Sequence, residues 1–418
     1  MKIAVVGAGV SGLVTAYLLS KPGSGHEITL FERNPYFGGH SHTISHPTPN
    51  GEIGLDTGFL VYNEPAYPRF SALLAELGVT TQASDMSFSV TCRACDLAYS
   101  SRGIGGLLAH PRGMLRPARA RLGIDILRFY RSAPRDAEDE TLSHLTLHDY
   151  LRHRHFSDEF RRHFLVPLAA AVWSMPPAEI DAFPAQYMLR FLLNHGLIGG
   201  NPARWRWRTV TDGSHSYVKT ILDRLGGHTT PEALTAVTRT AEGTAVTTAN
   251  RKQEFDAVVL ACHADEALAL LTDPTSEEQA ALEQLTFSSN RVVLHTDETL
   301  LPAQPGARAS WNYVTDDCRA DSGLALTYHL NRLQSIASPP DYCVSVNPNA
   351  AIAPHAIIEE MTYTHPRYSF ETIEAQQAIL ALNGERRTYF VGAWLGYGFH
   401  EDGVESAYRV ASLLGAVS

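Results

Sequence analysis

The sequence predicts an α/β fold of two domains, one built on a parallel sheet and the other of α+β type. Two observations lead to this prediction. A strand, a glycine-rich turn and a helix follow one another at the N-terminus, and a strand that ends in glycines precedes a helix at the C-terminus. The chain has 418 residues, which is more than a single simple core accommodates. We therefore expect the two ends of the chain to meet in one domain.

Composition and charge narrow the class of protein. Hydrophobic residues make up 44% of the chain and charged residues 19%, as in ordinary globular proteins. A formal net charge of -10 argues against general nucleic-acid binding, which needs a basic surface. Five cysteines in so long a chain do not form a disulfide framework, so we expect a reduced, cytoplasmic protein.

The N-terminal stretch Ala4–Leu19 is uncharged and superficially resembles a signal peptide. Its three spaced glycines are better explained by a nucleotide-binding turn. No other segment has the roughly 18 apolar residues that a membrane helix requires. We therefore expect neither a removed leader nor a membrane span.

The first strand and its glycine turn predict a dinucleotide site of Rossmann type. Ile3–Val6 is a short apolar run, typical of a strand buried on both faces, and residues 13–19 have the pattern of a helix. In such a turn the first glycine permits the sharp bend, the second lets the backbone approach a pyrophosphate, and the third lets helix and strand pack closely. The helix N-terminus then attracts the phosphates. The six residues of the turn are Gly7, Ala8, Gly9, Val10, Ser11 and Gly12.

An acidic residue follows at the spacing that this kind of site requires. Glu27–Phe31 predicts the second strand, which leads into Glu32 and Arg33. A carboxylate at this place accepts the ribose hydroxyls of the adenosine half and repels a 2′-phosphate. The cofactor is therefore expected to be FAD or NAD rather than NADP.

A second glycine pair distinguishes FAD from NAD. Gly38 and Gly39 follow the acid closely, and His40 and Ser41 come next. This pattern resembles flavoproteins of the amine-oxidase and phytoene-desaturase type, in which a second loop closes over the pyrophosphate and the ribityl chain. The resemblance implies FAD, held by the backbone of the glycine pair. His40 stands where these proteins usually have arginine, which leaves a side-chain charge contact open. Further FAD contacts are implied at Thr57, Gly58 and Phe59.

The C-terminal segment supports the same resemblance. Residues 387–394 predict a buried strand, residues 395–403 a glycine-rich turn, and Val404–Leu414 a helix. In amine-oxidase-like flavoenzymes this strand contacts the cofactor and the helix N-terminus points at the flavin. Asp402 also has the position of a helix cap. The FAD contacts that the resemblance implies here are Gly392, Ala393, Asp402, Gly403 and Val404, together with Val237, which stands where the family pairs backbone groups with adenine.

More narrowly, the chain resembles bacterial predicted FAD/NAD-binding proteins that are often encoded beside methyltransferases similar to cyclopropane-fatty-acid synthase. The similar segments span nearly the whole chain, whereas Ser406-Ala407 departs from a commoner Ser-Gly pair. The substrate is therefore less firmly implied than the cofactor. The similar segments are 38–40, 56–63, 167–174, 310–313, 327–334 and 398–403.

The same reading predicts the domain boundaries. The FAD-binding domain is expected to resemble that of glutathione reductase and to consist of residues 1–64, 210–285 and 385–418. Residues 65–209 and 286–384 are expected to form the substrate domain, with a helical part and an antiparallel sheet. Several aromatic residues of this domain are expected to line a dry cavity over the flavin, which suits a hydrophobic or acyl substrate. They are Trp173, Trp205, Trp207, Trp311, Tyr313, Tyr328 and Tyr363.

The loop that the family sets beside the flavin supplies the candidate catalytic residues, Tyr397 and His400. The ordinary pKa of histidine suits a general base, although His400 could instead only brace the loop. With FAD, the expected reaction is hydride removal from a C–H bond. Three functions stay open: oxidation of a modified fatty acyl chain, redox-neutral movement of a double bond, and assistance to a lipid methyltransferase. Amine oxidation and the tailoring of a natural product are also open.

Two further segments invite interpretation. Arg102–Arg135 contains eight arginines and one acidic residue, Asp125, interleaved with apolar residues. We expect either a solvated helical face or a surface for anionic lipid or an acidic partner protein. Cys92 and Cys95 form a Cys-x-x-Cys pair, but no second pair exists to complete a zinc site. Ordinary packing, with no metal, is the expectation there.

Overall fold

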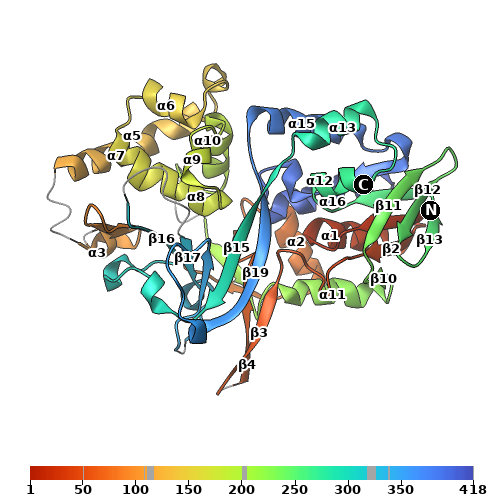
Figure 1. Ribbon diagram of the computed structural model, residues 1–418, viewed down its shortest axis with the longest axis horizontal. Helices are drawn as coiled ribbons and strands as arrows, with labels where there is room; N and C mark the ends of the chain where they lie inside the picture. The colour runs from red at the N-terminus through yellow and green to blue at the C-terminus, as the bar shows by residue number, and fades with distance from the viewer. Residues whose placement is uncertain are drawn as a thin grey trace.

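A computed structural model describes residues 1–49, 51–107, 109–110, 117–199, 205–317, 326–337 and 339–417. Figure 1 shows a molecule elongated in one direction. Both termini lie at one end, with the parallel sheet, and a group of helices lies at the other end. A large twisted sheet stands between them. The prediction of an α/β fold is confirmed.

The first and last parts of the chain meet in a five-stranded parallel sheet, as the sequence predicts. Ile3 and Val5 of the central strand pack against helices, whereas Ala4 packs on the opposite face of the sheet. From Ile3 to Val6 this strand is apolar, because neither of its faces reaches water there. In spatial order the strands are β10 (Thr229–Thr230), β2 (Glu27–Phe31), β1 (Lys2–Val6), β14 (Ala257–Leu260) and β20 (Thr388–Phe390).

Helices and a small sheet cover the two faces of the parallel sheet. On one face α1 (Val10–Leu19) contacts α11 (His215–Leu225) and α16 (His400–Leu413). On the other face lies a three-stranded antiparallel sheet with α12 and α13. The bounds are β11 (Leu234–Arg239), β12 (Thr244–Thr248), β13 (Lys252–Phe255), α12 (Ala264–Leu270) and α13 (Ser276–Glu283).

The last helix begins four residues earlier than the sequence predicts, at His400 rather than at Val404. The Asp402 carboxylate accepts a hydrogen bond of 2.9 Å from the Phe399 N–H, which satisfies a donor at the helix start. Gly403, which we expected in a loop, therefore lies in the first turn of the helix. A Cβ at Gly403 would lie 2.7 Å from Ser11 Oγ, so glycine allows α16 to pack closely on α1.

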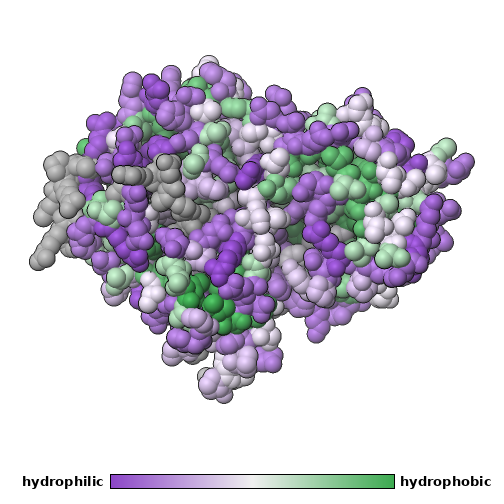
Figure 2. All heavy atoms as spheres, viewed as in Figure 1, coloured by the Kyte–Doolittle hydropathy of each residue, from purple (hydrophilic) through white to green (hydrophobic). Residues whose placement is uncertain are grey.

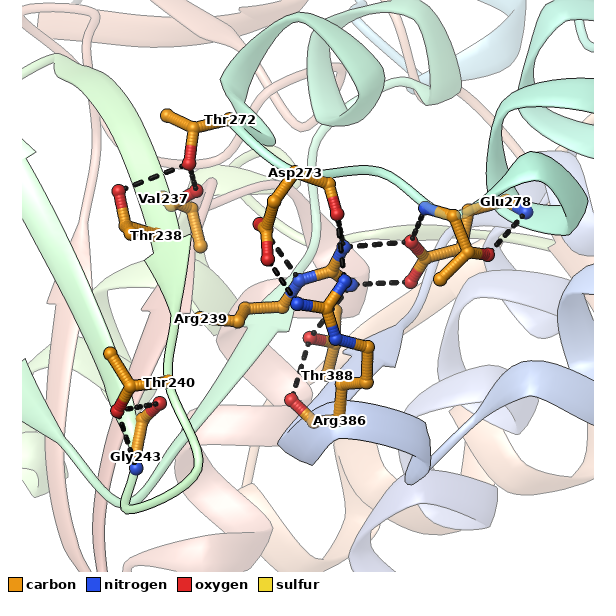
Figure 3. A network of polar contacts seen from close by, with 11 residues as sticks. Val237, Thr238, Arg239, Thr240, Gly243, Thr272, Asp273, Glu278, Arg386 and Thr388 are labelled. Atoms are coloured by element: carbon orange, nitrogen blue, oxygen red, sulfur yellow. Dashed lines mark hydrogen bonds and ion pairs between the residues drawn. The ribbon is translucent and has the colours of Figure 1, made fainter.

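A buried ion network joins the small sheet to α13 and to the turn that precedes β20 (Figure 3). Arg239 of β11 is almost fully buried and donates two hydrogen bonds to Glu278, of which the one from Nη2 to Oε2 measures 2.8 Å. Asp273 accepts from Arg239 Nε at 3.2 Å and also pairs with Arg386. Such a network is costly to break because one partner would be left charged and unpaired.

The sequence predicts an antiparallel sheet in the second domain. The seven-stranded sheet found there is mixed. Its β16 and β7 run parallel and come from segments far apart in the chain, whereas the other pairs are antiparallel. In spatial order the strands are β19 (Ile357–Pro366), β15 (Phe287–His295), β18 (Cys343–Val346), β17 (Leu326–His329), β16 (Trp311–Thr315), β7 (Phe88–Cys92) and β8 (Leu97–Ser100).

Short strands connect the domains. The hairpin of β3 (Thr43–Thr48) and β4 (Gly51–Asp56) follows the second glycine loop. The strands β5 (Tyr62–Asn63), β9 (Trp207–Val210) and β6 (Thr81–Ala83) form a small antiparallel sheet. The strands of the parallel sheet fall within the predicted FAD-binding ranges, and those of the large sheet fall within the predicted substrate ranges. The domain boundaries themselves stay a prediction.

The helical part of the second domain encloses a large apolar core, which accounts for the helical spacing of phenylalanines in the sequence. One turn of this helical part, Arg161–Leu165, is a π-helix. The other helices are α2 (Pro68–Leu77), α3 (Gly103–Leu107), α5 (Pro117–Asp136), α6 (Leu147–His153), α7 (Asp158–Phe160), α8 (Val166–Trp173), α9 (Pro177–Ile180), α10 (Ala185–Asn194), α14 (Leu330–Leu333) and α15 (Phe370–Leu382).

The surface in Figure 2 is mainly hydrophilic on the face shown, with apolar residues gathered over part of the domain that contains the parallel sheet and over the lower edge of the second domain. Within the described ranges, no helix has both the length and the apolar character that crossing a membrane would need.

Candidate active site

One cavity of about 730 Å³ lies between the two domains. At one end it is lined by the glycine turn after β1 and by the end of β2, and at the other by aromatic residues of the second domain. Ligands of open α/β sheets bind at this place, outside the carboxyl ends of the strands. The predicted site residues that line the cavity are Gly7, Ala8, Gly9, Val10, Ser11, Glu32, Arg33, Gly38, Gly39, His40, Gly58, Phe59, Gly392, Ala393, Tyr397 and His400.

The three glycines of the first turn have different surroundings. A Cβ at Gly12 would lie 1.8 Å from the Gly7 carbonyl oxygen, so α1 can approach the turn only with glycine there. Gly7 has a φ of +102°, a conformation that favours glycine. No atom lies within 4 Å of the place where a Cβ of Gly9 would stand, and Gly9 lines the cavity. The backbone at Gly9 is thus open to a ligand.

The Glu32 carboxylate lies at the end of β2, buried beside the glycine turn. Its Oε2 accepts from the Ala8 N–H at 2.8 Å, and its Oε1 accepts from the Asn34 N–H at 2.8 Å. Each carboxylate oxygen has a further lone pair, so Glu32 can brace both loops and still accept the hydroxyls of a ribose.

His40 closes the second glycine loop and carries an unpaired polar atom. Its Nε2 is buried without a hydrogen-bond partner, and the His40 ring lies 4.9 Å from that of Tyr363 and 5.3 Å from that of His365. Burial, with His365 and His263 nearby, holds the pKa of His40 well below its ordinary value. With its proton on Nε2, the neutral ring of His40 can donate a hydrogen bond to an anionic ligand.

The second glycine loop is braced by residues that lie behind the cavity wall. Ser41 Oγ lies 2.9 Å from His400 Nε2 and also contacts the Tyr217 hydroxyl. Thr57 Oγ1 donates to the His42 carbonyl at 2.9 Å. Ser41 and Thr57 do not line the cavity, so their contribution to a cofactor site is to position its loop.

His400 is held from three sides. Its Nε2 lies 2.9 Å from Ser41 Oγ and 3.1 Å from the Tyr217 hydroxyl, and its ring stacks on Phe59 with the centroids 3.7 Å apart. Burial lowers the pKa of His400 to about 3. The hydroxyls of Ser41 and Tyr217 already engage Nε2, the ring atom that would have to reach a substrate. The geometry therefore favours the bracing role that the sequence left open.

Five other predicted contacts lie outside the lining of the cavity: Gly12, Val237, Asp402, Gly403 and Val404. The Val237 carbonyl already accepts from the Thr272 N–H at 3.0 Å, and Leu234 and Thr235 of the same strand line the cavity instead. Val404 is fully buried in the core against α1. Asp402 caps α16, and burial raises its pKa to about 7. These five residues therefore support the residues of the cavity wall and do not form the wall themselves.

The substrate end of the cavity is aromatic. Of the aromatic residues that the sequence singled out, Tyr313 is buried in the core and Trp205 does not line the cavity. Tyr397 lies with its ring 4.4 Å from that of Tyr187, and its carbonyl accepts from Trp173 Nε1 at 3.2 Å. The aromatic residues that do line the cavity as expected are Trp173, Trp207, Trp311, Tyr328 and Tyr363.

Sequence reasoning missed His195, at the end of α10. Its Nδ1 donates to the Phe191 carbonyl at 3.0 Å, which leaves Nε2 as the acceptor atom of the neutral ring. That Nε2 is buried and has no partner, and His195 lines the cavity among aromatic residues. Burial lowers the pKa of His195 to about 4. No local pattern marks this histidine, because only the packing of α10 brings it to the cavity.

Comparison with known families decides the identity of the chain. Residues 10–332 match the model of the flavin containing amine oxidoreductases. The chain belongs to this family. It is therefore a flavin-dependent oxidoreductase, and its cofactor is FAD, as the sequence predicts. Comparison with curated proteins found no match.

Several solved structures share the fold over almost the entire chain. A CLA-producing fatty acid isomerase from P. acnes is 16% identical with a TM-score of 0.68, and the match covers 99% of this chain and 97% of that chain. Cyclohexylamine oxidase from Brevibacterium oxydans is 14% identical with a TM-score of 0.69, covering 99% and 98%. Putrescine oxidase bound to putrescine is 13% identical with a TM-score of 0.68, covering 100% and 99%. The narrower resemblance to methyltransferase-associated proteins stays a prediction.

The cavity of this amine oxidoreductase fits FAD at its nucleotide end. The open backbone at Gly9 suits the pyrophosphate, Glu32 suits the adenosine ribose, and His40, whose Nε2 has no partner, lines the same cavity. These residues would hold the cofactor, which supplies a two-electron acceptor.

Proposed function

We propose that this enzyme oxidises a hydrophobic, lipid-like substrate by removing hydride from a C–H bond. The observation that favours it is the lining of the cavity. Among the described residues that the second domain contributes to this lining, none is Asp, Glu, Lys or Arg. A cationic amine in this chamber would lack a carboxylate to pair with, and a free fatty-acid carboxylate would lack a basic partner. An acyl chain whose polar headgroup stays outside suits the chamber best.

We propose His195 as the proton acceptor in this reaction. Removal of hydride and of a proton from neighbouring carbons leaves a double bond, so a base must lie in the substrate chamber. The unpaired Nε2 of His195 meets this need, whereas His400 Nε2 is already engaged by two hydroxyls. In this proposal His400 positions the loop, and Tyr397 forms part of the aromatic wall of the chamber.

A double-bond isomerase is the second candidate, favoured by the fold shared with a fatty acid isomerase. The same chamber serves both reactions, because an isomerase returns the hydride to another carbon of the same chain. Mass spectrometry of a phospholipid with a monounsaturated acyl chain distinguishes the two: oxidation lowers the mass by two hydrogens, whereas isomerisation leaves it unchanged.

The experiment includes variants of the proposed base. His195→Gln is expected to lower turnover at least a hundredfold without changing the flavin spectrum. His148→Gln, at an exposed position of α6, is the matched control and keeps full turnover. Turnover of simple amines together with no conversion of any acyl lipid would contradict the proposal. A flavin that responds to neither would favour the helper role beside a methyltransferase.

The arginine-rich segment corresponds to α3, α5 and the residues between them, of which 108 and 111–116 lie outside the described residues, including Arg112 and Arg116. Arg119 is buried and donates to the Cys95 carbonyl at 2.6 Å, and Arg121 and Arg128 both pair with Asp125. These three arginines are therefore partly or wholly committed within the protein.

We propose that the exposed face of α5 binds anionic lipid membranes. Ile124 is 54% exposed and Leu127 59% exposed, and Arg131 follows them on the same face of the helix. Arg135 is also exposed, and Ile104 and Leu107 of α3 add further exposed apolar side chains. A helix with apolar and basic residues side by side suits the interface of an anionic bilayer. Figure 1 places α3 and α5 at the end of the molecule away from both termini.

A further inference from the structure

The turn between β7 and β8 brings together side chains that the proposed oxidation does not use. Cys92 ends β7, Cys95 lies in the turn, and His163 comes from the π-helical turn that packs on this hairpin. One ligand atom from each of these three residues lies within 4.8 Å of the other two. The sequence separates His163 from Cys95 by 68 residues, so no sequence pattern links it to the cysteine pair.

Two distances from His163 Nε2 suit a tetrahedral metal ion. Cys95 Sγ lies 3.7 Å from His163 Nε2, and Glu159 Oε2 lies 3.3 Å from the same nitrogen. Sulfur, nitrogen and oxygen ligands placed about 2.0–2.3 Å from a tetrahedral zinc ion are about 3.3–3.8 Å from one another. Two cysteines, one histidine and one carboxylate also make up a donor set that zinc prefers.

The backbone around the four residues is fixed from several sides. The Cys95 carbonyl accepts from Arg119 Nη2 at 2.6 Å, and the His163 carbonyl accepts from the Tyr99 hydroxyl at 2.6 Å. Cys92 and His163 are buried, whereas one third of the Glu159 side chain is exposed. The site is thus rigid on its inner side and reachable from solvent through Glu159.

We propose that Cys92, Cys95 and His163 bind one structural zinc ion, and that Glu159, which lies against His163 but outside the close group of these three residues, turns inward to complete the tetrahedron. With both thiols ionised and Glu159 charged, the bound site carries one net negative charge, which the guanidinium of Arg119 beside Cys95 offsets. The ion joins the β7–β8 hairpin, at the edge of the large sheet, to the helical part of the domain through the π-helical turn. This proposal replaces the expectation, drawn from the cysteine pair alone, that these residues only pack.

The metal content of the purified full-length protein tests the proposal. The protein, expressed with added zinc and freed of any affinity tag, is expected to contain about one zinc ion per chain by elemental mass spectrometry. Cys95→Ser and His163→Ala are expected to lose at least nine tenths of it. Cys343→Ala, a buried cysteine in β18, is the matched control and is expected to retain the zinc. Zinc retained in Cys95→Ser would overturn the proposal.

A second measurement needs only the wild-type protein. After removal of zinc with a chelator, added Co²⁺ is expected to give the intense visible absorption of tetrahedral thiolate coordination, which Zn²⁺ then abolishes. A protein that lacks zinc and gives no such absorption would overturn the proposal, as would a mass two hydrogens lower, which shows a Cys92–Cys95 disulfide. These readouts do not depend on lipid turnover, so the zinc proposal and the proposed function can fail separately.

Discussion

At the scale of single residues, Gly9 is the position at which a side chain would most directly exclude the cofactor. Gly9→Val is expected to abolish FAD retention, because the isopropyl group would fill the open space that the pyrophosphate needs. Titration of the apoprotein, followed by flavin fluorescence, measures the affinity. Gly123→Val is the matched control, since Gly123 also has no atom within 4 Å of its Cβ position but lies in α5.

Glu32→Ala is expected to weaken FAD binding less than Gly9→Val does. Hydrogen bonds to the ribose are lost, each with a charged acceptor and worth about 1.5–3 kcal/mol, but the phosphate cradle survives. A greater loss of affinity in Glu32→Ala than in Gly9→Val would show that these two roles are wrongly assigned.

His400 makes the stability of the protein depend on pH. Burial holds its pKa at about 3 in the folded state, well below the ordinary value of a histidine, so the unfolded chain binds a proton that the folded chain refuses. The stability that depends on neutral His400 is therefore present above about pH 6.5 and is lost as the pH falls toward 3.

His400→Gln is the variant that isolates this effect. At pH 5 the free energy of unfolding of the wild type is expected to be about 2 kcal/mol lower than at pH 7, because the unfolded chain binds a proton at His400. His400→Gln is expected to lack this loss. Urea unfolding at both pH values, with saturating FAD, measures the difference. An equal loss of stability in both proteins would mean that other groups account for the acid sensitivity.

At the scale of elements, the ion network of β11 and α13 sets up a stability prediction (Figure 3). Glu278→Ala is expected to destabilise the protein by about 3 kcal/mol, because the buried Arg239 loses its closest partner. The double variant Arg239→Met, Glu278→Leu is expected to be less destabilised, since it leaves no unpaired charge. Glu277→Ala, at an exposed neighbouring position, is the control for urea unfolding. Equal stability of Glu278→Ala and Glu277→Ala would refute the role of the network.

The exposed face of α5 gives a binding prediction. The protein is expected to sediment with phosphatidylglycerol vesicles but not with phosphatidylcholine vesicles, and less so as salt rises, because exposed charges are screened within about 10 Å at 0.1 M. Changing Arg131 and Arg135 to Ser is expected to lower the affinity about tenfold or more. The same change at Arg387 and Arg409, exposed on the other domain, is expected to have no effect.

A second double variant, Ile124→Ser with Leu127→Ser, tests the apolar part of this face and is expected to weaken vesicle binding at all salt concentrations. Unchanged vesicle binding in both α5 variants would show that this face is an ordinary solvated surface. Binding to no vesicle, together with capture of an acidic protein, would favour the other partner that the sequence left open.

The sequence predicts elements best where a local pattern and burial agree. The strand Glu27–Phe31 is confirmed residue by residue, because its apolar run is bounded by turn residues on one side and Glu32 on the other. The start of α16 was misplaced because its first turn consists of polar residues and a glycine, which are typical of loops. The role of Arg119 could not be foreseen, since its burial depends on a hairpin distant in the chain.

At the scale of the whole molecule, the fold and the cofactor follow from motifs that lie within single segments, whereas the substrate chamber does not. The spacing of Gly9 and Glu32 predicts a dinucleotide site, and the glycine pair Gly38-Gly39 that follows points to FAD. His195 and His163 gain their surroundings from the packing of helices far apart in the sequence. A single sequence contains no periodicity that reports such contacts, so both residues had to be found in the structure.

The central claim is that an FAD enzyme with an uncharged chamber takes hydride from an acyl lipid. Anaerobic mixing of the holoenzyme with a monounsaturated phospholipid, followed by the flavin absorbance near 450 nm, tests this claim most directly. The account predicts that the absorbance bleaches with the lipid and not with putrescine, and that His195→Gln bleaches at least a hundredfold more slowly. Bleaching by putrescine, with no response to any acyl lipid, would contradict it.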